Sequence, residues 1–397
     1  MELSRRVQAI KPSPTLAVTA RAAALKATGR DIIGLGAGEP DFDTPQHIKD
    51  AAIAAINAGF TKYTAVDGTP GLKAAVIAKF KRDNGLDYTP KQVLVSCGGK
   101  QSFFNLVQAV INAGDEVIIP APYWVSYPDI VILADGRPVI VEAGIEQGFK
   151  ITPAQLEAAI TPKTRLFVIN SPSNPTGAVY TRDELAALGE VLRKHPQVLI
   201  ASDDMYEHIR LNDVPFVNIL NVCPDLYDRT LVLNGVSKAY SMTGWRIGYA
   251  AGPESILRAM TNVQSQSTSN ATSISQMAAE AALNGDQGCI TPMLDAFKTR
   301  HRYVVDALNA IPGFHCVDSG GAFYAFPDVR PAIMNLLARD IIEEPTDIAF
   351  SEYLLESADV AVVPGSAFGA EGYIRLSFAT SQTNLEKAIK RIVAALA

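Results

Sequence analysis

Residues 166–206 read LFVINSPSNPTGAVYTRDELAALGEVLRKHPQVLIASDDMY. This stretch opens on an apolar run at 166–169, passes through a helical stretch at 182–194 and closes on a second apolar run at 198–201. Both runs have the length of a strand and lack polar alternation, which predicts strands that are buried on both faces. Two such strands with a helix between them indicate a parallel βαβ unit.

Similar units extend along the chain on both sides of this stretch. Further apolar runs of strand length lie at 93–97, 117–120, 138–141, 230–233 and 247–250, with helical stretches at 101–111 and 153–160 between them. This alternation predicts an α/β fold, in which a mostly parallel sheet is flanked by helices.

The pattern changes beyond about residue 285. A long helical stretch at 291–311 is followed by separated strands and by a last helix at about 382–396. The separated strands are expected at 315–317, 322–326, 360–363 and 373–379. This order predicts a smaller α+β domain. We therefore predict an N-terminal segment at 1–40 that packs with the small domain, a large domain at 41–285 and a small C-terminal domain at 286–397.

The composition argues against several classes of protein. The 397 residues carry a formal net charge of -6, whereas a duplex-binding domain normally has a basic excess, so we expect no nucleic acid partner. The four cysteines are far apart and form no CxxC pair, so no metal site or disulfide framework is expected. No apolar stretch reaches 18 residues, and the N-terminus lacks the apolar region of a secretory signal. We therefore expect a cytoplasmic protein without a membrane span.

Candidate ligand-binding residues follow the predicted strands, because ligands bind beyond the carboxyl ends of strands in open α/β sheets. Gly99 and Lys100 follow the strand at 93–97 and begin a helix, where backbone N–H groups suit a phosphate. The alternative is a tight strand-to-helix turn. Asn174 follows the strand at 166–169 in a proline-rich loop, for which the alternative is an ordinary turn.

Two further strands end on residues of opposite charge. Asp203 and Tyr206 follow the strand at 198–201, and the alternative role for Asp203 is a helix N-cap. Lys238 follows the strand at 230–233, where partial burial would lower its pKa toward that of a Schiff-base lysine. The alternative is a lysine that reaches solvent. Together with Arg246, these groups match what pyridoxal phosphate requires: a lysine, an anionic partner for the ring nitrogen, and cations for the phosphate.

Eight sequence motifs extend over nearly the whole chain: GAGEPDFDTP at 36–45, KYT at 62–64, SCGGKQ at 96–101, PYWVSY at 122–127, NSPSNPTG at 170–177, SDDMYEH at 202–208, SKAYSMTGWRIG at 237–248 and YIRLSFA at 373–379. With these motifs the chain resembles the class I and II aminotransferases, which are pyridoxal-phosphate enzymes of fold type I. Within this family the sequence is most similar to bacterial aspartate aminotransferases. One departure is Asp204, where these enzymes often have glutamate.

The resemblance implies a role for each matching residue toward pyridoxal 5'-phosphate. Lys238 would form a Schiff base with the cofactor, Asp203 would pair with its ring nitrogen, and Trp124 would stack on its ring. Tyr206 and Asn174 would hydrogen-bond its phenolic oxygen. The phosphate ligands would be Gly99, Lys100 (main chain), Ser237 and Arg246, together with Tyr63 of a neighbouring subunit. The resemblance therefore implies a homodimer with shared active sites.

The same resemblance implies the substrate contacts. Arg375 would bind the substrate α-carboxylate bidentately, and the backbone of Gly38 would touch the same group. Trp124 and Asn174 belong to this substrate-binding set as well as to the cofactor set. The side chain of Lys100 is a candidate ligand for a second carboxylate. Lys11, Ser13 and Thr15 are candidates to close over the substrate, although a solvated terminal lysine is the alternative for Lys11.

These observations predict an aminotransferase that moves an amino group between aspartate or glutamate and a 2-oxo acid by a ping-pong mechanism. The alternatives are a prephenate or aromatic aminotransferase and a pyridoxal-phosphate-dependent lyase on the same fold, because a fold does not determine a reaction. A ligand-sensing regulator would carry a DNA-binding domain before the enzyme-like part, and only about 35 residues precede the first strand. The expected partners are small amino and oxo acids.

Overall fold

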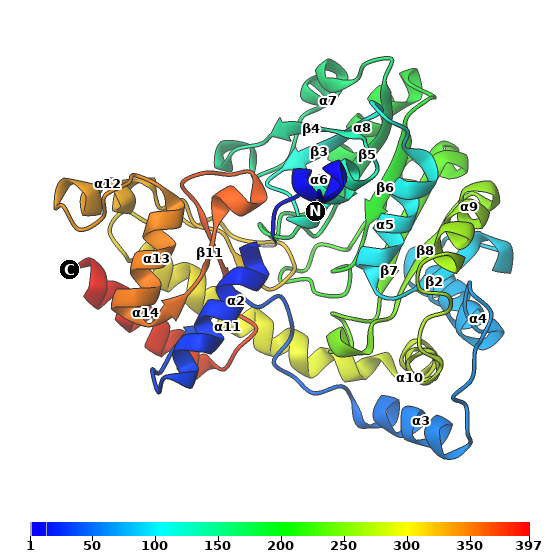
Figure 1. Cartoon of the computed structure of the whole chain (residues 1–397), viewed down its shortest axis with the longest axis horizontal. Helices are drawn as coiled ribbons and strands as arrows, with labels where there is room; N and C mark the ends of the chain where they lie inside the picture. The colour runs from blue at the N-terminus through cyan, green and yellow to red at the C-terminus, as the bar shows by residue number, and fades with distance from the viewer. Residues whose placement is uncertain (1, 13) are drawn as a thin grey trace.

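A large sheet lies on the right in Figure 1, which shows the computed structural model; the model describes residues 2–12 and 14–397. In these residues, seven strands form this sheet in the order β2-β8-β7-β6-β5-β3-β4. Their bounds are β2 (Val93–Ser96), β3 (Glu116–Ala121), β4 (Arg137–Glu142), β5 (Thr164–Asn170), β6 (Leu199–Asp203), β7 (Thr230–Gly235) and β8 (Gly248–Ala251). β8 is antiparallel to β2 and β7, and the other neighbouring strands are parallel. The predicted mostly parallel α/β sheet is confirmed.

Successive residues of the strands enter two different cores, one on each face of the sheet. Phe167 of β5 packs in the same core as Leu188, whereas Val168 packs in the other core with Leu106. Leu188 belongs to α8 (Arg182–Lys194) and Leu106 to α5 (Gly99–Val110), so helices cover both faces. This double burial explains why the strands lack polar alternation in the sequence. The other helices associated with this part are α3 (Gln46–Asn57), α4 (Pro70–Lys79), α6 (Ser126–Leu133), α7 (Pro153–Ala159), α9 (Glu254–Ser265) and α10 (Ser273–Asn284).

The C-terminal part contains long helices and short strands. Its helices are α11 (Thr291–Asn309), α12 (Arg330–Ala338), α13 (Asp347–Ala358) and α14 (Gln382–Leu396). Its strands β9 (Tyr324–Ala325), β11 (Val363–Pro364) and β12 (Ile374–Ser377) form an antiparallel sheet in the order β11-β12-β9. The division of the chain at residues 40 and 285 stays a prediction.

The N-terminal segment runs alongside both parts of the molecule (Figure 1). β1 (Ile33–Gly34) pairs in parallel with β10 (Val360–Ala361). α2 (Pro14–Ala27) buries Ala22 in a small core with Leu355 of α13. α1 (Arg5–Ala9) lies against α6 instead, where Arg6 forms an ion pair with Asp135. The segment therefore passes from the central sheet to the C-terminal part.

The strand expected at 315–317 was a wrong prediction. The structure has an isolated bridge there, between His315 and Asp328. The backbone of Cys316 instead bonds the side chain of Asn309, whose Oδ1 accepts from the Cys316 N–H at 2.8 Å and whose Nδ2 donates to the Cys316 carbonyl at 2.9 Å. A side-chain amide thus satisfies groups that a strand partner would otherwise bond. No helix in the described part of the chain has both the length and the hydropathy for crossing a membrane.

Candidate active site

The predicted site residues gather around one cavity of about 270 Å³. It lies where β5, β6 and β7 end, because Asn170, Asp203 and Ser237 stand at or just beyond the ends of these strands. The predicted residues that line it are Thr15, Gly38, Gly99, Lys100, Trp124, Asn174, Asp203, Tyr206, Ser237, Lys238, Arg246 and Arg375. Of the predicted residues that the structure describes, Tyr63 and Lys11 are the two outside this lining.

Lys238 lies half-buried at the wall of the cavity. Its Nζ donates a hydrogen bond to the carbonyl oxygen of Gly38 at 2.5 Å. Burial lowers the pKa of Lys238 to about 8, and the positive charges of Arg375 and Arg246 act in the same direction. A large share of Lys238 is therefore neutral near pH 8, which suits a nucleophile and a base. The alternative of a lysine that extends into solvent does not fit this position.

Asp203 ends β6 and faces the cavity. Its Oδ2 accepts a hydrogen bond from Tyr127 Oη at 2.5 Å, and its Oδ1 accepts one from the Met205 N–H at 3.2 Å. Burial raises the pKa of Asp203, while these two hydrogen bonds and the charge of Lys238 oppose the increase. Residues 205–208 form turns, and residues 204–209, all described, contain no helix, so Asp203 is not a helix N-cap.

A potential anion site lies at the N-terminus of α5. Gly99 and Lys100 are its first residues, and the first N–H groups of a helix have no partner within the helix. Arg246 is held over this end, with Nη1 donating to the Thr243 carbonyl at 2.9 Å and Nη2 to the Cys97 carbonyl at 3.3 Å. Gly98 leaves the room for this arginine, because a Cβ at Gly98 would lie 2.3 Å from Arg246 Nη2.

Arg375 is a buried cation that also lines the cavity, with 2% of its surface exposed. Nη1 donates to Asn174 Oδ1 at 2.8 Å, and Nη2 donates to the Gly36 carbonyl at 2.6 Å. Its Cζ lies 4.4 Å from the ring centroid of Tyr324 and 5.0 Å from that of Phe368. Arg375 Nε is buried without a hydrogen-bond partner among the described residues, so the guanidinium retains a donor for a ligand carboxylate.

Lys100 directs its ammonium group toward an aromatic side chain. Its Nζ lies 5.4 Å from the ring of Trp124. Burial and the charge of Arg246 lower the pKa of Lys100. The other candidates lie further out: Lys11 is exposed beside Asp129, and 91% of Tyr63 is exposed. Ser13 lies outside the described residues.

Two tyrosines of the cavity wall were not predicted from the sequence. Tyr127 stands three residues after Trp124 in the PYWVSY motif, so the spacing of one helical turn was a usable signal. Tyr324 lies in the apolar run at 322–326, which is typical of a core strand and contains no signal of a ligand site. Thr243 and Met205 also line the cavity.

The geometry fits pyridoxal phosphate. Lys238 and Asp203 supply the nucleophile and the anion that this cofactor needs, while the start of α5 and Arg246 form a cradle for a phosphate. The unpaired Nε of Arg375 leaves a donor for the carboxylate of an amino acid. The fold and the site thus define an enzyme that acts on amino acids with this cofactor.

Comparisons with known proteins identify the family. The model of the aminotransferases of class I and II matches residues 30–392, and the chain belongs to this family. An aspartate/prephenate aminotransferase of Nitrosomonas europaea is 68% identical over 396 residues, which are the full length of both chains. The aspartate aminotransferase of Geobacillus stearothermophilus is 54% identical over 393 residues, which are 99% of this chain and 98% of that enzyme.

Solved structures agree with this assignment. The aspartate aminotransferase of Rhizobium meliloti has a TM-score of 0.94 at 49% identity, with 100% of this chain and 99% of that chain covered. The enzyme of Thermus thermophilus with maleate has a TM-score of 0.93 at 44% identity, and both chains are fully covered. The predicted family, fold, dependence on pyridoxal phosphate and aminotransferase activity are therefore confirmed, and the lyase alternative is not supported.

Proposed function

We propose that this aminotransferase moves an amino group between a dicarboxylic amino acid, aspartate or glutamate, and oxaloacetate or 2-oxoglutarate. The observation that carries this proposal is a pair of cationic side chains, Arg375 and Lys100, that line the cavity in addition to Lys238 and Arg246. Arg375 has an unpaired buried donor, and Lys100 lies over Trp124. Two cations suit two carboxylates, and the names of the Geobacillus and Thermus relatives support the same substrate class.

Each candidate residue has a proposed part in holding the cofactor. Bound pyridoxal phosphate supplies an electron sink for the bonds at the substrate Cα. Lys238 attaches the cofactor, and Asp203 keeps a proton on the ring nitrogen. The side-chain oxygen of Asn174 accepts a hydrogen bond from Arg375. The NH₂ group of Asn174 is therefore free to donate to the phenolic oxygen of the cofactor, as is the Tyr206 hydroxyl. The remaining ligands are the ring of Trp124 and, for the phosphate, the main chain of Gly99 and Lys100, Ser237 and Arg246.

Lys238 also moves the proton of the reaction. With its Nζ not attached to the cofactor, Lys238 would be a neutral amine because of its lowered pKa, and it would accept the proton from the substrate Cα. Arg375 would hold the α-carboxylate, with the backbone of Gly38 beside it, and would thereby determine which bond of the substrate Cα is broken. This orientation favours deprotonation over decarboxylation.

We also propose that the active unit is a homodimer in the cytoplasm. Tyr63 is almost fully exposed in the single chain, and Ile53, Ile56 and Phe60 lie exposed near it in the sequence. An apolar surface of this kind is suited to being covered by a second copy, which would bring Tyr63 to the phosphate of its neighbour. The four cysteines are free in the described chain, which agrees with a reducing compartment.

Prephenate is the second candidate substrate. It is favoured by the name of the Nitrosomonas relative, which is 68% identical over its full length. Prephenate carries a second carboxylate on a ring and is bulkier than the open-chain acids, so Thr15 and Lys11 of the N-terminal segment are its proposed contacts. Thr15 lines the cavity, whereas Lys11 is exposed outside the cavity lining on the same segment.

A panel of amino donors tests both candidates. Aspartate, phenylalanine and the amino acid derived from prephenate are each assayed with 2-oxoglutarate, glutamate is assayed with oxaloacetate, and kcat/KM is compared. We expect the acidic donors to exceed phenylalanine by at least tenfold, because phenylalanine gives Lys100 no carboxylate to bind. Equal constants for aspartate and phenylalanine would contradict the proposal.

A further inference from the structure

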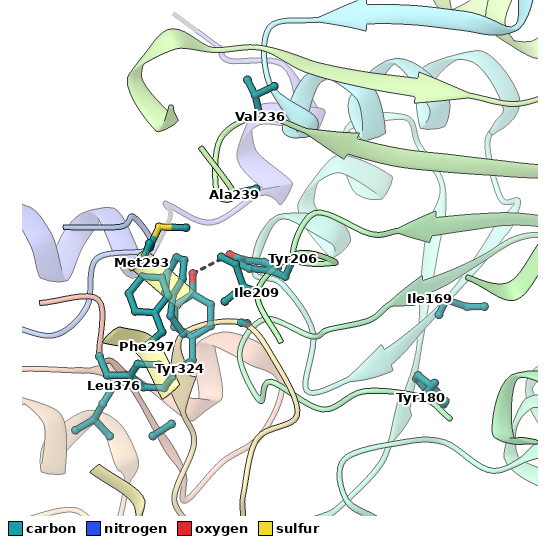
Figure 2. Close-up of a cluster of buried hydrophobic side chains, with 14 of the residues drawn as sticks. Ile169, Tyr180, Tyr206, Ile209, Val236, Ala239, Met293, Phe297, Tyr324 and Leu376 are labelled. Carbon is teal, nitrogen blue, oxygen red and sulfur yellow. Dashed lines mark hydrogen bonds between the residues drawn. The ribbon is translucent and has the colours of Figure 1, made fainter. Parts of the chain in front are cut away.

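Two buried tyrosine hydroxyls meet at the inner wall of the cavity. Tyr206 Oη and Tyr324 Oη are 2.8 Å apart, and Figure 2 shows the two side chains pointing at one another. Tyr206 follows β6 of the central sheet, whereas Tyr324 begins β9 in the C-terminal part. This hydrogen bond therefore joins residues that are 118 positions apart in the sequence.

The ring of Tyr324 serves a second neighbour. Arg375 stands on β12, which pairs with β9, and its guanidinium lies 4.4 Å from the Tyr324 ring centroid. A cation over an aromatic face is attracted by the ring quadrupole, and the attraction is larger where water is excluded. Tyr324 thus contacts Arg375, the candidate residue for binding the substrate carboxylate, with the face of its ring, and it contacts Tyr206 with its hydroxyl.

The two hydroxyls can share their protons in two ways. Burial raises the pKa of both tyrosines, so each keeps its single proton at neutral pH. If Tyr206 donates to Tyr324, Tyr206 has no proton left for another acceptor. If Tyr324 donates to Tyr206, the Tyr206 proton is free to be donated into the cavity, and a chain of hydrogen bonds in one direction strengthens each member.

We propose that Tyr324 is a positioning residue that acts on both halves of the site: its ring holds Arg375, and its hydroxyl directs the Tyr206 proton toward the cofactor's phenolic oxygen. This inference rests on the proposed roles of Tyr206 and Arg375. Arg375, which would bind the substrate carboxylate, and Tyr206, which would bind the cofactor, are both neighbours of Tyr324. Displacement of the Tyr324 side chain therefore changes the position of both residues.

The experiment uses the loaded enzyme and three variants: Tyr206→Phe, Tyr324→Phe and the double variant. The readout is the pH midpoint at which the visible absorbance of the bound cofactor changes, with kcat and KM for aspartate measured in parallel. Tyr324→Phe is expected to move the midpoint in the same direction as Tyr206→Phe and by less. Its kcat/KM is expected to fall by about two- to tenfold, which corresponds to one neutral hydrogen bond.

The double variant distinguishes positioning from a structural role. If Tyr324 acts through Tyr206, Tyr324→Phe has no further effect on the midpoint in the Tyr206→Phe background. An additive shift would overturn the proposal, as would an unchanged midpoint in Tyr324→Phe. If Tyr206→Phe itself leaves the midpoint unchanged, the proposed role of Tyr206 fails, and that result is separate from the additive one.

The role of the ring is tested by Tyr324→Leu. Loss of the aromatic face is expected to raise KM for aspartate about two- to fivefold above that of Tyr324→Phe, because Arg375 loses its platform. An equal KM in these two variants would contradict this part. Tyr180→Phe is the matched control, since Tyr180 is also buried and accepts a hydrogen bond from the Ile151 N–H, but does not line the cavity. Its midpoint is expected to equal that of the wild type.

Discussion

Replacement of Tyr127 by phenylalanine is expected to weaken the acid that faces the cofactor. Tyr127 Oη donates to Asp203 Oδ2 at 2.5 Å, and the substitution removes this hydroxyl alone. The ring remains available for its edge-to-face contacts with Phe103 and Trp124, whose centroids lie 4.8 Å and 5.2 Å away. The packing of α6 should therefore survive, while Asp203 loses one of its two hydrogen bonds.

The size of the effect follows from the charge of the acceptor. A hydrogen bond to a charged group contributes about 1.5–3 kcal/mol, and one pKa unit corresponds to about 1.36 kcal/mol. The pKa of Asp203, which burial already raises, should increase by a further one to two units or so. Asp203 supports the reaction as a carboxylate, which exists above its pKa, so activity is lost as the pH falls through that value. A higher pKa moves this loss to higher pH.

The assay is the pH dependence of kcat/KM for aspartate, which reports the groups of the free enzyme. We expect the acid limb of Tyr127→Phe to lie about one to two units above that of the wild type, with thermal unfolding nearly unchanged. Tyr180→Phe, which removes a buried hydroxyl away from the cavity, should keep the wild-type profile. Superimposable profiles for Tyr127→Phe and the wild type would refute the reasoning.

Four further predictions concern single residues. Lys238→Ala should fold without turning over, and borohydride reduction of the native enzyme followed by peptide mapping should place the cofactor on Lys238 and on no other lysine. Lys100→Ser should lower kcat/KM for aspartate by about one to two decades and change phenylalanine far less, since a charged hydrogen bond contributes about 1.5–3 kcal/mol; equal losses would show that Lys100 supports the cofactor or the fold. If Tyr63 completes the site of its neighbour, sedimentation at assay concentration should show a dimer, and a fully active monomer would disprove the shared site. Lys79 is 1% exposed and forms a buried ion pair with Glu207, so Lys79→Met, which leaves the Glu207 carboxylate buried without this cation, should lower the free energy of unfolding by about 3–5 kcal/mol in urea titrations; an unchanged free energy would contradict this.

The order of strands and helices could be predicted because it depends on local patterns. Apolar runs without alternation mark strands that are buried on both faces, and this held for β5 and β6, whose residues enter two cores. The rule that ligands bind at the carboxyl ends of parallel strands then placed Asp203 and Lys238 at one edge of the sheet. The prediction failed at 315–317, where a side chain from α11, Asn309, takes the backbone bonds of a strand partner.

Contacts between distant residues were determined by the tertiary structure. Tyr127 bonds an acid 76 residues away, and Tyr324 meets a tyrosine 118 residues away. The apolar neighbours of Tyr324 in the sequence indicate a core strand, and they do not show that its hydroxyl faces a cavity. Periodicity and motifs record what a residue needs from its immediate neighbours in the chain, whereas hydrogen bonds and burial depend on which elements the fold packs together.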